Sequence, residues 1–291
     1  MKRVIWIATA LILLGTSPQS EMSLPSFCAE IASQAHALRW NTELCNGGVH
    51  WQVLGRSVQG RPLIAAQFGK PFARNTTLIL AAVHGDEITP VYLGIKVAHW
   101  LREQLGTYSD QQVVIAPIVN PDGFLAKPRT RVNARGVDLN RNFATRDWKP
   151  GRRGGDRRRF PGLKAQSEPE TQFQLELIRR FKPTKILSIH SPLNVLDYDG
   201  PSQLSLKRFP KDYVKSCLDL RQELKASSSG FFPGSLGNMA GRELGIPVVT
   251  LELPTADPIH AERYWREFRN GIRTMVEFDV GSGAAHAAQK L

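Results

Sequence analysis

The sequence predicts one α/β domain built on a mixed, mostly parallel central sheet with helices on both faces. Four short apolar runs, at residues 77–83, 113–119, 185–189 and 246–253, have the composition of buried strands. Helical patterns lie between several of these runs, and strands that alternate with helices are typical of such a sheet. A chain of 291 residues with 42% hydrophobic residues can bury a sizeable core.

The first elements are expected at an edge of the sheet. Residues 50–53 and 63–68 read as strands, and the glycines between them mark a hairpin or turn. The first buried run follows, and after it a helical pattern extends from Pro90 through Leu105.

Later elements repeat the order of strand, turn and helix. The second buried run ends at Asn-Pro-Asp-Gly (120–123), a strong turn signal. Ser167 and Glu170 have the spacing of a capping box, which predicts a helix to about residue 181 with a proline in its first turn. Residues 260–278 read as a closing amphipathic helix.

The first twenty residues have the pattern of a secretory signal peptide. Lys2 and Arg3 precede an apolar run at 4–14, which is too short to span a bilayer comfortably, and small and polar residues follow it. The alternatives are an uncleaved anchor and a buried first helix. We expect a periplasmic or secreted protein.

Disulfides persist in exported proteins, so the three cysteines could include a disulfide pair. Cys28 and Cys45 are close in sequence and could form a disulfide that ties the N-terminal segment to the domain. Cys217 would then be a small buried hydrophobic residue. Three free thiols are the alternative.

The formal net charge of +12 is concentrated in part at 146–159, where Arg and Lys alternate with Gly and Pro. Such a strip is usually a solvated loop, but in an exported protein it could contact an anionic surface or cell wall. No nucleic-acid partner is expected, because no aromatic interleaving or recognition motif accompanies the charge.

Candidate metal ligands lie where the predicted strands end. His84 and His190 each follow a buried run, and ligands gather at the carboxyl ends of strands in such sheets. Glu87 is three residues after His84 at a helix start, so both side chains can face one point. Two imidazoles and one carboxylate form a catalytic zinc arrangement that leaves one position open. The alternative for His190 is a strand-end histidine bonded to backbone.

Glu252 and nearby basic residues are candidates for catalysis. Glu252 lies inside an apolar strand, where a charge is costly unless it has a partner or a function. It could take a proton from water and deliver it to a leaving amine. Arg131 or Arg141 could stabilise an oxyanion, and a guanidinium next to Asn140 could hold a substrate carboxylate. A salt bridge for Glu252 and solvated arginines are the alternatives.

Several motifs in one order make the chain resemble the zinc carboxypeptidase family from about residue 55 to 254. These motifs are Gly-Arg-Ser-x-x-Gly-Arg (55–61), His84-x-x-Glu87, Asn-Pro-Asp-Gly (120–123), Arg131-x-Asn133, Val-Asp-Leu-Asn-Arg-Asn-Phe (137–143), Ser-Glu-Pro-Glu-Thr (167–171), His190-Ser191, Gly234-Ser235-Leu236 and Leu251-Glu252-Leu253.

The resemblance implies one zinc ion and a role for each candidate residue. The ion would be held by His84, Glu87 and His190, and Arg131 would polarise the substrate carbonyl. Asn140 and Arg141 would hold a substrate carboxylate, and Glu252 would act as general base and acid. We expect the chain to consist of a signal peptide (1–20), an N-terminal segment (21–48), a zinc peptidase domain (49–280) and a flexible tail (281–291).

Within the family, the segments His-Ser-Pro-Leu (190–193) and Tyr-Asp-Gly-Pro (198–201) look most like the murein peptide amidases. Those enzymes cleave the γ-D-glutamyl–diaminopimelate bond of cell-wall peptides. Asp197 or Asp199 could meet the diaminopimelate ammonium group, although either could be an ordinary loop residue.

One departure from the family pattern concerns substrate placement. A Tyr that contacts substrate usually stands a few residues before the Gly-Ser pair, whereas residues 230–234 read Gly-Phe-Phe-Pro-Gly. The alternatives to a murein peptide amidase are a carboxypeptidase acting on protein C-termini and an amidohydrolase of acylated amino acids. An inactive cell-wall-binding protein is the alternative outside the enzymes.

Overall fold

The computed structural model describes residues 21–104, 106, 110–152, 154–200 and 232–280. The expectations for the signal peptide, Cys217, residues 230–231 and the tail lie outside these residues. In the described part, no helix has the length and apolar character needed to cross a membrane.

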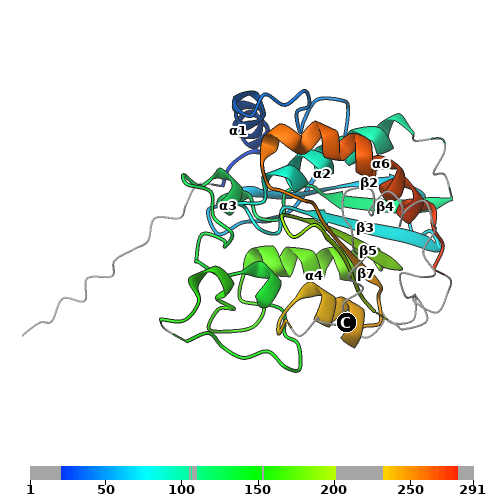
Figure 1. Cartoon of the computed structure of the whole chain (residues 1–291). Helices are drawn as coiled ribbons and strands as arrows, with labels where there is room; N and C mark the ends of the chain where they lie inside the picture. The colour runs from blue at the N-terminus through cyan, green and yellow to red at the C-terminus, as the bar shows by residue number, and fades with distance from the viewer. Residues whose placement is uncertain (1–20, 105, 107–109, 153, 201–231, 281–291) are drawn as a thin grey trace, which may run out of the picture.

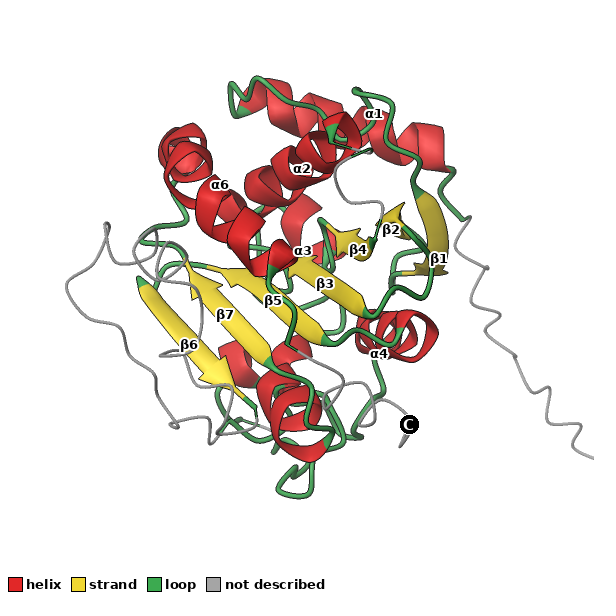
Figure 2. Cartoon of the chain, turned by 90° about the vertical axis from the view of Figure 1, so that its right-hand side faces the viewer, coloured by secondary structure: helices red, strands yellow, loops and turns green. Residues whose placement is uncertain are grey.

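Seven strands form one mixed sheet (Figure 2). They are β1 (Gln52–Arg56), β2 (Pro62–Gly69), β3 (Asn75–Ala81), β4 (Gln111–Ala116), β5 (Lys185–His190), β6 (Val195–Asp199) and β7 (Val248–Glu252). Their order is β1-β2-β4-β3-β5-β7-β6. The four central strands, β4, β3, β5 and β7, are parallel, while β1, β2 and β6 pair in the antiparallel sense.

Helices cover both faces of this sheet (Figure 1). On one face lie α1 (Leu24–Ala37), α2 (Ile88–Glu103) and α6 (Ala261–Glu277); on the other lie α4 (Pro169–Phe181) and a π-helical segment, η5 (Gly237–Glu243). Successive side chains of β3 therefore enter different cores: Ile79 packs on the α2 side, whereas Leu78 and Leu80 pack on the α4 side. The predicted fold class is confirmed.

Helix α1 and strand β6 are among the elements that were not expected, and both lie outside the apolar runs. Helix α1 begins after Ser23, whose Oγ accepts a hydrogen bond from Ser26 N, and it buries Phe27 and Ile31 in the main core. Strand β6 is a five-residue edge strand with mixed burial, so it has no continuous apolar run. The expected disulfide is confirmed: Cys28 in α1 is bonded to Cys45, with 5.8 Å between their Cα atoms.

The predicted capping box is wrong. The residue before α4 is Glu168, and the Ser167 hydroxyl donates to its carboxylate at 2.6 Å instead of capping the helix. Glu170 accepts hydrogen bonds from Val58 N and from the Asn133 side chain. The Ser167 side chain is thus bonded to its neighbour and the Glu170 side chain to residues distant in sequence, although the proline stands in the first turn as predicted.

Strand ends and one turn also differ from the prediction. Strand β1 covers residues 52–56 rather than 50–53, and β3 ends at Ala81, although Val83 beyond it is buried. The turn at 120–123 is one helical turn, α3 (Pro121–Leu125), in which the Asn120 side chain accepts from Gly123 N at 2.9 Å. Helix α3 packs against the segment that follows β3, where Gly123 meets Gly85.

Candidate metal centre

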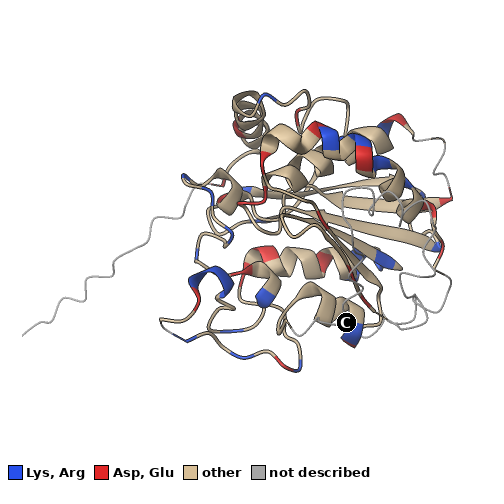
Figure 3. Cartoon of the chain, viewed as in Figure 1, with Lys and Arg blue, Asp and Glu red and all other residues tan. Residues whose placement is uncertain are grey.

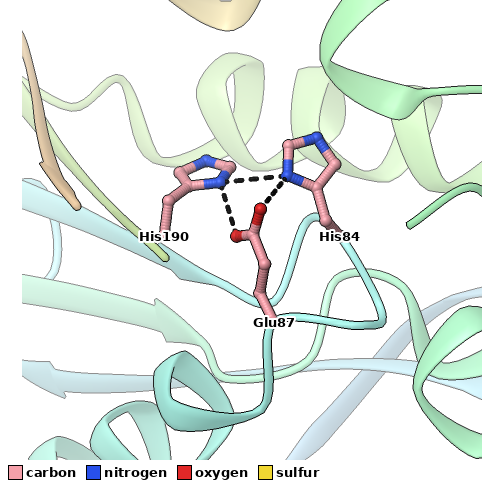
Figure 4. Close-up of side chains that lie close together, drawn as sticks. All are labelled: His84, Glu87 and His190. Atoms are coloured by element: carbon pink, nitrogen blue, oxygen red, sulfur yellow. Dashed lines mark hydrogen bonds and ion pairs between the residues drawn. The ribbon is translucent and has the colours of Figure 1, made fainter. Parts of the chain in front are cut away.

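Three buried side chains converge where β3, β5 and α2 meet (Figure 4). His84 follows β3, Glu87 immediately precedes α2, and His190 is the last residue of β5. The Glu87 carboxylate lies 2.7 Å from His84 Nδ1 and 2.9 Å from His190 Nδ1, and the two nitrogens are 3.2 Å apart. All three possible ligand atoms lie within 4.8 Å of one another.

A glycine allows the turn between His84 and Glu87. A Cβ atom on Gly85 would lie 2.1 Å from the carbonyl carbon of Gly123, which is far inside any tolerable contact. Only a residue without a side chain lets this turn rest on the backbone of α3. The parallel register of β3 and β5, with Ala81 opposite Ile189, then brings His190 to the same edge of the sheet.

The charges of this cluster compensate one another. His84, Glu87 and His190 are 2%, 4% and 3% exposed, so each would be costly to bury alone. Burial by itself would raise the pKa of Glu87, but the two histidines hold it well below its usual range. Burial by itself would lower the pKa of His84, but the carboxylates of Glu87 and Asp138 raise it to about 9.

The structure adds Asp138, a residue to which the sequence analysis gave no role. Its Oδ1 lies 3.1 Å from His84 Nε2, and its Oδ2 accepts from Arg131 Nε at 3.0 Å. A carboxylate at Nε2 orients the imidazole and directs Nδ1 towards the cluster, as the outer partners of metal-binding histidines do. The sequence feature that could have identified Asp138 is its position as a charged residue between two apolar residues, Val137 and Leu139.

This donor set fits a zinc ion. Two imidazole nitrogens and one carboxylate oxygen face a common point, and this is the ligand set of catalytic zinc sites that keep one position for water or substrate. The backbone N–H of Ser191 and the Arg131 guanidinium also face the Glu87 carboxylate, at 3.2 and 3.4 Å. The carboxylate is thereby fixed in place before any ion binds.

Glu252 lies beside the cluster on the neighbouring strand. It is the last residue of β7 and is paired in register with His190 of β5. Burial raises the pKa of its carboxyl group, and its Oε2 accepts from Leu193 N at 3.4 Å. Within the described residues no arginine forms an ion pair with it, so the salt-bridge alternative has no support in this part of the chain.

Asn140 and Arg141 lie on the other side of Asp138, in the short 3-10 helix η1 (Leu139–Arg141). Asn140 Oδ1 accepts from Leu236 N at 2.8 Å, which leaves the amide N–H groups as the donors of this side chain. The guanidinium of Arg141 stacks on the ring of Phe232 at 4.5 Å from its centroid. In the segment where the family pattern has a Tyr, this chain therefore places an aromatic ring against Arg141.

Gly234 fixes the approach of this segment to Arg141. Its φ of +73° is in the left-handed region, and a Cβ atom there would lie 2.1 Å from the carbonyl oxygen of Arg141. The structure thus brings Arg131 and Glu252 next to the three candidate ligands, with Asn140 and Arg141 adjoining them through Asp138.

Comparisons with known proteins identify the class of this site. The family model for zinc carboxypeptidases matches residues 39–234, so the chain belongs to that family and is a hydrolase of the metallopeptidase class. Murein peptide amidase A of Escherichia coli is 34% identical over 75% of this chain and 88% of its own length. The protein of that name from Vibrio campbellii is 32% identical over 72% of this chain and 79% of its own length.

Solved structures agree with this assignment. The crystal structure of a murein-tripeptide amidase from Escherichia coli matches with a TM-score of 0.60 and 31% identity, covering 78% of this chain and 92% of that chain. Carboxypeptidase A from Helicoverpa armigera matches with a TM-score of 0.62 at 19% identity, covering 94% of this chain and 75% of that chain, and shows the shared fold.

Asp138 offers a test of how His84 is held. Replacing it by asparagine should lower zinc affinity by about 10- to 100-fold, because the imidazole loses the carboxylate that orients it. Competition with a chromophoric chelator would measure this. Asp122→Asn is the matched control, since Asp122 is equally buried and accepts from Ser57 and Arg61 away from the cluster. Equal zinc affinity in the Asp138 variant and the wild type would contradict the assigned role.

Proposed function

We propose that the protein is a zinc metallopeptidase that hydrolyses an amide bond in murein peptides, with the γ-D-glutamyl–diaminopimelate bond as its target. The zinc ligands are His84, Glu87 and His190. The observation that carries the proposal is the convergence of these three buried side chains beside Glu252 in a relative of the murein peptide amidases.

We further propose that residues 1–20 are removed on export to the periplasm or cell exterior.

The zinc ion and the residues around the cluster would each have a separate role in the hydrolysis. A bound zinc ion would act as a Lewis acid that polarises the scissile carbonyl and acidifies water. Glu252 accepts a proton from the attacking water and returns it to the leaving amine, because its carboxylate stands beside the ligand His190. Arg131, anchored by Asp138 and Glu87, supplies positive charge for the developing oxyanion.

Asn140 and Arg141 hold a carboxylate of the substrate. The amide N–H groups of Asn140 and the guanidinium of Arg141 can both donate to it, and a guanidinium binds a carboxylate through two parallel hydrogen bonds. Phe232 stacks on the guanidinium and thereby fixes its plane. The ring could thus support substrate placement without the hydroxyl that the family pattern provides.

Of the two aspartates considered for the diaminopimelate ammonium group, we propose Asp197 because of its place on β6. Asp199 is 8% exposed and accepts from Arg242 Nε at 3.2 Å, and it packs against the glycines of η5. It stands opposite Val248, at the end of β7 remote from Glu252. Asp199 therefore has a structural role.

Asp197 stands closer to the catalytic edge. It pairs with Thr250, two residues before Glu252, and Thr250 pairs with Ser188, two residues before His190. Because strand side chains alternate between faces, this row shares the face of His190 and Glu252. The Ser188 hydroxyl is buried without a hydrogen-bond partner among the described residues. A polar row with a carboxylate suits a cationic substrate side chain.

A carboxypeptidase acting on protein C-termini is the second candidate. The catalytic chain of rat carboxypeptidase N is 29% identical over 50% of this chain, although the match spans only 38% of that protein.

An amidohydrolase of acylated amino acids would not need both Asn140 and Arg141. An inactive wall-binding protein would have no need of a complete set of ligands, base and arginines.

The primary test is mass spectrometry of defined murein peptides after incubation with the zinc-loaded mature protein. Wild type should release diaminopimelate-containing products by cleavage of the γ-D-glutamyl bond. Glu252→Gln should retain zinc but lose turnover by about 10²- to 10⁴-fold, because the proton acceptor is gone. Release of C-terminal residues from ordinary peptides with murein peptides left intact would favour the second candidate.

Asp197 can be tested with substrates that differ at one side chain. Replacing Asp197 by asparagine should lower kcat/KM by about tenfold for a substrate with an ammonium group after the scissile bond, since a charged hydrogen bond is lost. The value for a 2-aminopimelate analogue, which lacks only that ammonium group, should stay unchanged. Asp199→Asn is the control and should affect both substrates equally. A parallel loss on both substrates in the Asp197 variant would refute the pairing.

A further inference from the structure

The segment 146–159 carries many of the Lys and Arg residues coloured blue in Figure 3. Three backbone or side-chain hydrogen bonds fasten it and the residues after it to the substrate-binding motif. Asp138 N donates to Phe160 O at 2.8 Å, Asn142 Nδ2 donates to Pro161 O at 2.9 Å, and Trp148 Nε1 donates to Arg141 O at 2.9 Å. These hydrogen bonds fix the position of the segment next to Asn140 and Arg141, so it is not simply a solvated charged loop.

The arginines at its end are gathered in one short 3-10 helix, η2 (Arg157–Arg159). Asp156 caps this turn by accepting from Arg158 N at 2.9 Å. The guanidinium of Arg158 lies 2.9 Å from the carboxylate of Asp86, which stands between the ligands His84 and Glu87. The arginine turn is therefore docked against the metal-binding turn itself.

Several guanidinium groups gather at this rim. Arg131 is bonded to Asp138, whose carboxylate also contacts His84. The carbonyl of Phe160, the residue after Arg159, accepts from Asp138 N, so the end of the arginine turn lies beside this group. Burial lowers the pKa of Arg141, and repulsion from Arg131 and Arg159 acts in the same direction. Among the described residues, the one ion pair of Arg159 is a loose contact with Asp156, at 3.9 Å between largely exposed side chains, which adds little stabilisation.

One substrate carboxylate held by Asn140 and Arg141 would leave the exposed guanidinium of Arg159 available for a second one. A γ-linked glutamyl residue keeps its own α-carboxylate on the acyl side of the scissile bond, where the α, β and γ carbons separate it from the scissile carbonyl. We propose that Arg159 binds this second carboxylate, so that the arginine turn selects peptides with an acidic group on the acyl side of the cleaved bond. The inference rests on the proposed function and names a specificity determinant for it.

The test compares two murein tripeptides that differ only at the α-carboxyl of the glutamyl residue, which is free in one and amidated in the other. Wild type should cleave the acid with a kcat/KM about three- to tenfold above that of the amide, as expected for a partly exposed charge pair. Arg159→Gln should bring this ratio close to one by slowing only the acid. Arg159→Lys should restore part of the preference, because the charge remains.

Arg152→Gln is the matched control, since it removes the same charge from the same segment outside the turn. It should leave the ratio at the wild-type value. Equal cleavage of acid and amide by wild type, or an unchanged ratio in Arg159→Gln, would overturn the role of Arg159 while leaving the peptidase assignment intact. Cleavage of neither peptide by the zinc-loaded wild type would overturn both.

Discussion

The buried carboxylate of Glu87, held between two imidazoles, is the interaction on which the rest of the site depends. A charge with 4% exposure must be compensated locally, and each contact that compensates it comes from a different part of the chain. His84 comes from the segment after β3, His190 from the end of β5, and Arg131 from the stretch after α3. Their meeting requires the parallel sheet, the close turn at Gly85 and α3 together.

Around this cluster, each group is oriented by a partner further out. Asp138 directs His84 and anchors Arg131, and as the residue before η1 it also positions Asn140 by accepting from its backbone N–H at 3.0 Å. One aspartate thus links the candidate metal ligands to the groups proposed to bind substrate. Such shared anchoring keeps the relative positions of several functional groups within narrow limits, as catalysis demands.

The sequence predicted the parts of this arrangement that follow from local burial. Apolar runs marked β3, β5 and β7, and the polar residues at their ends were correctly expected to meet, since parallel strands present their carboxyl ends at one edge. Asp138 was missed although it lies between Val137 and Leu139, the same signal that singled out Glu252. The capping box failed because Glu170 is bonded to Val58 and Asn133, which lie far away in sequence, and no local pattern shows such partners.

The central claim is that His84, Glu87 and His190 hold one divalent cation. A crystal of the zinc-loaded protein, measured on both sides of the zinc absorption edge, tests it most directly. The account predicts one strong anomalous peak about 2.0–2.2 Å from both Nδ1 atoms and the Glu87 carboxylate. A peak located elsewhere, or no zinc at this site in protein that contains a full equivalent of the metal, would contradict it.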